Sequence, residues 1–298
     1  MKKVLFATTA LVAFTGAAAA EVSLSGYAEM GIAGGDSIES QFHTDIDVKF
    51  SLSGTTDNGL EFGATIDLDE EGGFAATNGG PESVFIKGAF GNLTMGDTDG
   101  ALDWALTEVA MLTAIADDHS THGGYNGNGN FDGVFDGQIA RYDYSFGDFA
   151  VAASVELDDS GVNDPNFGLG AKYSGDFGGV GLGVGVGVHM FETGGMSYDT
   201  AGISVKVSAS GFDAVVNYVD WDDYLGNESY ASIGLGYTTG AISVTANYGV
   251  IELTAGGESE GWGAAANYDL GGGAVLMVGY GDTDGGASTW SAGLGLSF

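Results

Sequence analysis

The sequence predicts an all-β fold, a closed antiparallel transmembrane β-barrel of sixteen strands. Apolar residues alternate with polar ones in successive segments of about nine to thirteen residues, the pattern of strands with one apolar face. Turns rich in Gly, Asn and Asp separate these segments. The chain contains 55 Gly and only two Pro, yet 44% of its residues are apolar, a composition unsuited to a packed soluble core. Alternating strands can cross lipid only as a closed barrel, because every backbone polar group must be paired there.

The first 20 residues have the features of a secretory signal peptide. Lys2 and Lys3 are followed by an apolar stretch, residues 4–14, and by small residues at 17–20. A helix that spans a membrane needs about 20 apolar residues, and this stretch is shorter. We therefore expect residues 1–20 to be removed before Glu21, so that residues 21–298 form the barrel.

The mature chain is strongly acidic. It would keep five of the seven Lys and Arg and all 41 Asp and Glu, which gives a net charge of −36. This charge excludes nucleic acid as a partner, because binding to phosphates needs clustered Lys and Arg. The absence of Cys excludes disulfides and thiolate metal sites.

The alternation can be followed from Glu21 to the end of the chain. In one segment Val48, Phe50 and Leu52 share a face, while Lys49 lies on the other. After the turn at residues 55–57 the next segment repeats the pattern. The same reasoning predicts strands at residues 21–33, 42–54, 58–70, 81–90, 92–97, 138–146, 148–157, 166–174, 180–191, 198–209, 211–220, 229–238, 241–252, 260–269, 273–281 and 288–298.

The expected connections alternate in length. Bacterial outer-membrane barrels have short periplasmic turns and longer external loops, so this alternation suits a meander of that kind. Short connections fall near residues 55–57, 91, 147, 175–179, 210–211, 239–240 and 270–272, and longer polar ones near 34–41, 71–80, 97–137, 158–165, 192–197, 221–228, 253–259 and 282–287.

The two strand faces suit lipid outside and water inside. The apolar face ends in aromatic residues, as the interfacial girdles of a membrane barrel require. The alternative is a soluble sandwich, in which the apolar faces of two sheets pack together. All five mature basic residues lie on the polar face, and exposing one to lipid would cost about 2 to 4 kcal/mol. We therefore place these residues on the pore wall: Lys49, Lys87, Arg141, Lys172 and Lys206, with the acids Asp45, Asp47 and Asp67.

Residues 97–137 form the one long segment that resembles neither a strand nor a tight turn. Loops of more than about 12 to 15 residues are uncommon in compact domains unless they are functional or disordered. Apolar residues in its middle indicate that it packs against something, so we expect it to fold back into the barrel as a constriction. It has eight acids and no Lys or Arg, and the candidates for the constriction are Asp97, Asp99, Asp103, Glu108, Asp117 and Asp118.

Four segments and the last residue carry a resemblance to a known family: SGTTDNGLEFGATIDLDE at 53–70, FIKGAFGNLTMGD at 85–97, YDYSFGDFAVAASV at 142–155, YDLGGGAVLMVGYGD at 268–282, and Phe298. They resemble the general diffusion porins of alphaproteobacteria, especially those of purple non-sulfur bacteria. The resemblance implies a homotrimeric sixteen-stranded barrel in the outer membrane of a Gram-negative bacterium, with the third external loop folded inward. In that family basic wall residues face acidic residues of this loop. This chain departs from the pattern, since Asp45 and Asp47 stand where a wall strand would supply Arg.

Other chemistry has few candidate residues. Asp117, Asp118, His119 and His122 are weak candidates to hold a divalent cation, and the alternative is a solvated loop. Calcium that bridges crowded loop acids is a second option. The sequence DTDG occurs at residues 97–100 and 282–285, but neither turn belongs to a twelve-residue calcium-binding loop. The sequence lacks a nucleophile elbow and a metalloprotease helix motif, so we expect no enzymatic activity and no cofactor.

These observations lead us to expect a channel through which small hydrophilic solutes and ions diffuse, with a preference for cations. The alternatives are a barrel with a specific solute or an enzymatic task, and a soluble secreted β protein. A solute-specific barrel would need a ladder of aromatic residues in the lumen, where the alternation places few, such as Tyr27 and Phe85.

Overall fold

The computed structural model describes residues 21–36, 38–69, 82–116, 134–135, 138–158, 161–284 and 288–298. The predicted signal peptide, residues 1–20, lies outside these ranges and stays a prediction. None of the helices among the described residues is long and apolar enough to cross a membrane.

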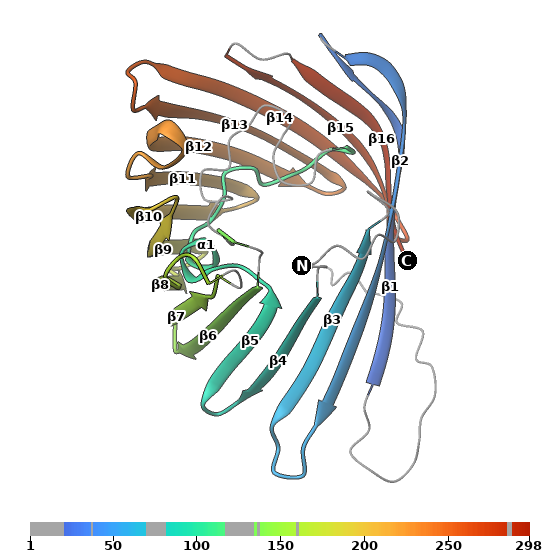
Figure 1. Cartoon of the computed structure of the whole chain (residues 1–298). Helices are drawn as coiled ribbons and strands as arrows, with labels where there is room; N and C mark the ends of the chain where they lie inside the picture. The colour runs from blue at the N-terminus through green and yellow to red at the C-terminus, as the bar shows by residue number, and fades with distance from the viewer. Residues whose placement is uncertain are drawn as a thin grey trace.

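Sixteen antiparallel strands close into a barrel, which confirms the predicted architecture (Figure 1). Each strand pairs with its neighbours in sequence, and β1 closes the ring by pairing with β16. The strands are β1 Glu21–Gly35, β2 Ile38–Thr55, β3 Glu61–Asp69, β4 Glu82–Gly88, β5 Gly91–Asp97, β6 Gln138–Phe146, β7 Phe149–Glu156, β8 Asn166–Asp176, β9 Val180–Thr193, β10 Met196–Ala209, β11 Phe212–Asp220, β12 Asn227–Thr239, β13 Ile242–Leu253, β14 Glu258–Gly271, β15 Ala274–Thr283 and β16 Thr289–Ser297.

Two of the predicted long connections are wrong. Residues 34–41 and 192–197 are mostly strand, because β1 and β2 pair as far as Gly35 with Ile38, and β9 and β10 as far as Thr193 with Met196. Gly194 and Gly195 then make the turn with φ of 61° and 76°, the left-handed region that glycine adopts readily. A strand that continues beyond the lipid has water on both faces, so its sequence lacks the alternation on which the prediction rested.

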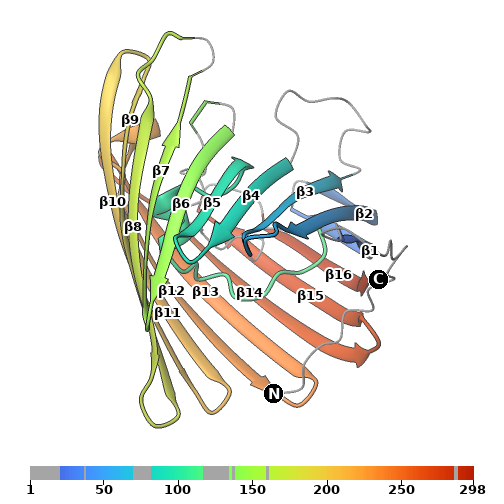
Figure 2. The same ribbon diagram turned by 90° about the horizontal axis from the view of Figure 1, so that it is seen from below.

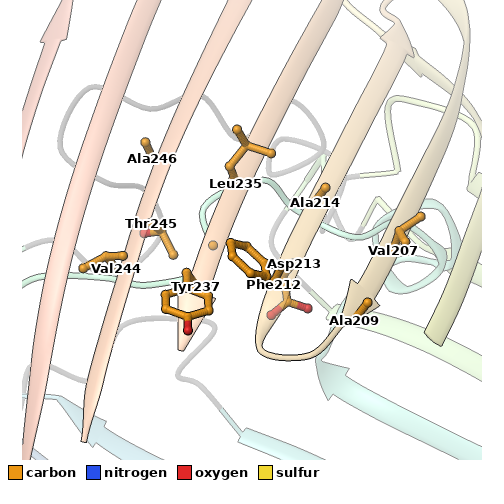
Figure 3. A pocket seen from close by; sticks show the side chains of 11 residues that line it. Val207, Ala209, Phe212, Asp213, Ala214, Leu235, Tyr237, Val244, Thr245 and Ala246 are labelled. Carbon is orange, nitrogen blue, oxygen red and sulfur yellow. The ribbon is translucent and has the colours of Figure 1, made fainter. Parts of the chain in front are cut away.

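The outer surface of the barrel is apolar, as the alternation predicts. A shallow groove of about 570 Å³ lies on the outer surface of β10 to β13, bordered by Val207, Phe212, Leu235 and Val244. Figure 3 shows the side chains that line it. The ring centroids of Phe212 and Tyr237 lie 4.3 Å apart, with the two ring planes tilted by 34°. The wall is uneven in height, since β4 and β5 have 7 residues each while β9 and β10 have 14 (Figure 2). Because the apolar face of the strands forms the outer surface, their polar face lines the interior of the barrel.

Candidate functional site: the inner-wall loop and the charged lumen

The chain after β5 lies inside the barrel. The short helix α1, Ala101–Ala105, rests on the inner faces of β7, β8 and β9 (Figure 1). Ala101, Leu102 and Ala105 are buried there, and Val109 and Ile115 are buried farther along the segment. Residues 98–116 are named the inner-wall loop below. Its apolar residues face the wall, as the sequence analysis expected for the middle of this segment.

Wall side chains hold the backbone of the inner-wall loop by hydrogen bonds. Their partners in the loop are main-chain groups, so these bonds add to the packing of the loop's buried side chains. The bonds run from Arg141 Nη1 to the Asp99 carbonyl (2.5 Å), from the Ala101 amide to Ser154 Oγ (2.9 Å), from Lys172 Nζ to the Trp104 carbonyl (3.0 Å), from the Thr107 amide to Ser204 Oγ (2.8 Å), from Asn217 Nδ2 to the Thr107 carbonyl (3.1 Å), from Asn267 Nδ2 to the Thr113 carbonyl (3.4 Å) and from the Ala116 amide to Glu29 Oε2 (2.8 Å).

Glycines on the wall make room for the inner-wall loop. A methyl group at Gly185 would lie 1.9 Å from the Ala105 carbonyl oxygen, whereas ordinary contact begins at 3.4 Å. A methyl group at Gly170 would lie 2.1 Å from the Ala101 oxygen, and one at Gly234 would lie 2.2 Å from the Val109 oxygen. The three glycines, on β8, β9 and β12, therefore form a seat for the loop backbone, named the glycine seat below.

A second contact holds the chain where it returns toward β6. The amides of Val134 and Phe135 donate to the two carboxylate oxygens of Glu156 at 2.8 and 3.1 Å, and Asn166 donates to the same carboxylate at 2.8 Å. Glu156 and Asn166 are both buried. The sequence pattern did not indicate this contact, or those of Ser154, Ser204, Asn217, Asn267 and Glu29. The only available signal was a polar residue at a lumen-facing position, which many wall residues share.

The lumen side holds more aromatic residues than expected. Phe191, Trp221 and Tyr230 are buried in one cluster with Leu102 and Leu106 of the inner-wall loop. The expectation of few lumen aromatics was therefore wrong. The loop covers this cluster, so these rings pack a core and do not form an open ladder along the pore.

Two of the predicted wall cations fasten the loop. Arg141 has only 10% of its side chain exposed and lies 3.5 Å from the Asp99 carboxylate and 3.9 Å from that of Asp143. Lys172 places its ammonium 3.6 Å from the centroid of the Trp104 ring, a cation–π contact, besides bonding the Trp104 carbonyl. Both positive charges are thus engaged beneath the loop.

The other three basic residues pair with carboxylates on the wall. Lys49 lies 2.8 Å from Asp67, and Lys87 lies 2.8 Å from Glu61 on the neighbouring strand. Lys206 lies 3.6 Å from Asp213, a longer separation. Positive charge on the described wall is therefore largely matched by acids.

The candidate acids fall into distinct places. Asp103 and Glu108 are half-buried on the inner-wall loop, Asp99 approaches Arg141, and Asp97 is the last residue of β5. The remaining candidates of this segment, Asp117, Asp118, His119 and His122, lie outside the described residues. Within the described part of the chain no group of three or more His, Cys, Asp or Glu is placed to hold a metal ion.

The wall formed by β1 to β3 is also acidic. Asp47, Lys49 and Asp67 border a cavity of about 330 Å³ together with Tyr27. Asp45 shares the face of Asp47 on β2 and is paired in register with Glu29 on β1. Glu29 accepts a hydrogen bond from Tyr27 and lies 3.0 Å from His43. Figure 1 shows this wall across the barrel from α1, so carboxylates stand on both sides of the lumen.

Known proteins resemble this chain over nearly its whole length. A family model for Gram-negative porins matches residues 7–288. The porin of Rhodobacter capsulatus is 30% identical over 312 aligned positions, which cover 93% of this chain and 99% of that protein. A solved porin structure, refined at 1.8 Å, has a TM-score of 0.77 at 25% identity, covering 93% of this chain and 100% of the other. A mutant of the Rhodopseudomonas blastica porin has a TM-score of 0.69 at 18% identity with the same coverage, a likeness of fold. With a closed barrel, a polar lumen and these matches, the chain belongs to the family of Gram-negative porins.

Proposed function

We propose that this outer-membrane diffusion porin is cation-selective, and that the inner-wall loop forms its constriction. The observation that carries the proposal is the arrangement of charge around the lumen. Carboxylates lie on the loop and on the facing wall, while each Lys and Arg of the described barrel contacts a carboxylate or a loop carbonyl. A lumen in which acids outnumber basic residues holds a negative potential that concentrates cations.

The test is the reversal potential of single channels in a salt gradient. The variant D103N/E108Q/D117N/D118N removes four loop charges, and D45N/D47N removes two from the facing wall as a comparison. We expect the cation preference to fall in both variants and to fall further in the first. A preference that stays unchanged in the loop variant would remove the loop from the mechanism and leave the wall acids as its source. A preference unchanged in both would contradict the proposal.

Diffusion without a binding step separates this function from a solute-specific barrel. The family indicates a channel and not an enzyme, and we propose that the chain has no hydrolytic activity. Flux of small sugars into vesicles should rise linearly with concentration. Saturation at low solute concentration would instead favour a specific site, and lipid hydrolysis by the purified protein would favour an enzyme.

A homotrimer is the assembly we propose, from the family resemblance and the apolar outer faces where the ring closes. Val22 and Leu24 on β1 are exposed and apolar. On β16, Ala292, Leu294 and Leu296 lie in register with Ile32, Met30 and Ala28 of β1. Identical barrels related by a closed cyclic axis would cover these faces. A monomeric mass in mild detergent, unchanged after cross-linking, would argue against the trimer.

A further inference from the structure

A separate cavity lies beside the inner-wall loop, toward the short turns. It has a volume of about 340 Å³, room for about ten waters. Lys172 on β8 and Lys206 on β10 border it from two sides, and Thr107 of the inner-wall loop also lines it. The strand between them, β9, contributes Gly181 and Gly183 as its floor. Both lysines therefore face one open space inside the barrel.

The glycines of this floor do not serve the loop. Gly185, next along the same face of β9, has no space for a methyl group because the Ala105 oxygen would lie 1.9 Å from it. A methyl group at Gly183 would meet only Lys206 Cβ at 3.6 Å and the Tyr173 carbonyl oxygen at 4.0 Å, and one at Gly181 would meet nothing closer than Ser208 Cβ at 3.6 Å. Glycine within a strand weakens it, and often marks a place where a ligand or another backbone comes close. Among the described residues, only the neighbouring strands of the sheet come within 4 Å of these two positions.

The lysines have hydrogen-bonding capacity to spare. An ammonium has three N–H donors. That of Lys172 donates one to the Trp104 carbonyl and also lies over the Trp104 ring, and no ion pair joins it to a carboxylate of the described residues. Lys206 lies 3.6 Å from Asp213, too far for a hydrogen bond, and Ser208 also contacts that carboxylate. The hydroxyl group of Ser174 adds a neutral donor at the edge of the cavity, whereas the Ser208 hydroxyl already donates to Asp213.

We propose that this cavity binds a small oxyanion, a phosphate or a carboxylate, between Lys172 and Lys206 over the glycine floor. Two ammonium groups and the hydroxyl of Ser174 match the several acceptor oxygens of such an anion, and hydrogen bonds to a charged group are the stronger kind. The bare floor lets the anion approach the strand closely. The pore therefore binds small oxyanions transiently at this site, although the net negative charge of the lumen favours cations.

Inorganic phosphate is the probe for this site. Titration calorimetry of phosphate into the full-length mature protein in mild detergent measures binding without relying on conduction. Single-channel current in 0.1 M KCl, with phosphate added on one side, measures the resulting interruptions. We expect phosphate to bind and to interrupt the current from one side more strongly than from the other, because the cavity lies on one side of the loop. Acetate compares a carboxylate with phosphate, and chloride is the reference.

Three variants decide the outcome. K206Q leaves the seven hydrogen bonds between the wall and the loop backbone in place and should weaken phosphate binding by about tenfold or more. G183V fills the floor and should do the same without removing a charge. K49Q/K87Q removes two lumen charges elsewhere and should retain binding. Binding unchanged in K206Q and G183V, or phosphate no more effective than chloride, would overturn the proposal, and neither result depends on cation selectivity.

Discussion

Adding methyl groups to the glycine seat should displace the inner-wall loop and change the current. In G185A the new methyl would lie 1.9 Å from the Ala105 oxygen, so the loop must move into the lumen by more than an ångström to reach ordinary contact. An extra methyl in a packed site costs about 1 to 3 kcal/mol. The seven bonds from the wall to the loop backbone stabilise its position by about 4 to 10 kcal/mol, at about 0.5 to 1.5 kcal/mol each. One methyl should therefore shift the loop without detaching it.

The triple variant G170A/G185A/G234A should detach the inner-wall loop from the wall. Its cost of about 3 to 9 kcal/mol, if the three sites add, is comparable with the stabilisation from the hydrogen bonds. We expect G185A to give a lower but steady single-channel conductance in 1 M KCl, and the triple variant to give fluctuating currents with a broad range of conductance.

A matched control separates loop displacement from the general effect of Gly-to-Ala in a strand. Gly26 lies on β1, and a methyl there would meet only ordinary contacts at 3.6 and 3.7 Å. G26A should conduct as the unmodified protein does. All variants must first show the circular dichroism of a folded barrel. A folded triple variant with the original steady conductance would show that the seat does not position the loop.

Three further predictions concern the contacts around the loop. E156A removes the acceptor of the half-buried Val134 and Phe135 amides, so proteinase K should cleave residues 97–137 faster, with E156Q intermediate. Equal cleavage rates would contradict the anchoring role of Glu156. R141L removes a buried charge that bonds the Asp99 carbonyl and should lower the melting temperature, while R141K keeps the charge and should lower it less; no change in R141L would show that this contact is dispensable. Cation preference measured at 0.15 M and 1 M salt should weaken as the Debye length shortens from about 8 Å to about 3 Å, and a constant preference would point to short-range contacts instead of the field.

The strand pattern was readable from the sequence because a strand in a membrane barrel meets lipid on one side and water on the other. That period of two set the number of strands, their order and the inward placement of Lys49, Lys87, Arg141, Lys172 and Lys206. It failed where both faces meet water, as at the ends of β1, β2, β9 and β10. The unusual length and composition of residues 97–137 also marked the loop without any structural information.

The roles of individual lumen residues were not readable in this way, because they depend on which distant segment lies over each wall position. Gly183 and Gly185 stand two residues apart on the same face of β9 within the run GLGVGVGVH. Only Gly185 lies under the backbone of Ala105, and Gly183 borders an open cavity. Likewise Arg141 and Lys172 bond the loop while Lys49 and Lys87 bond wall acids. Periodicity assigns a side chain to a face, but the partner it meets there comes from the path of a chain segment many residues away.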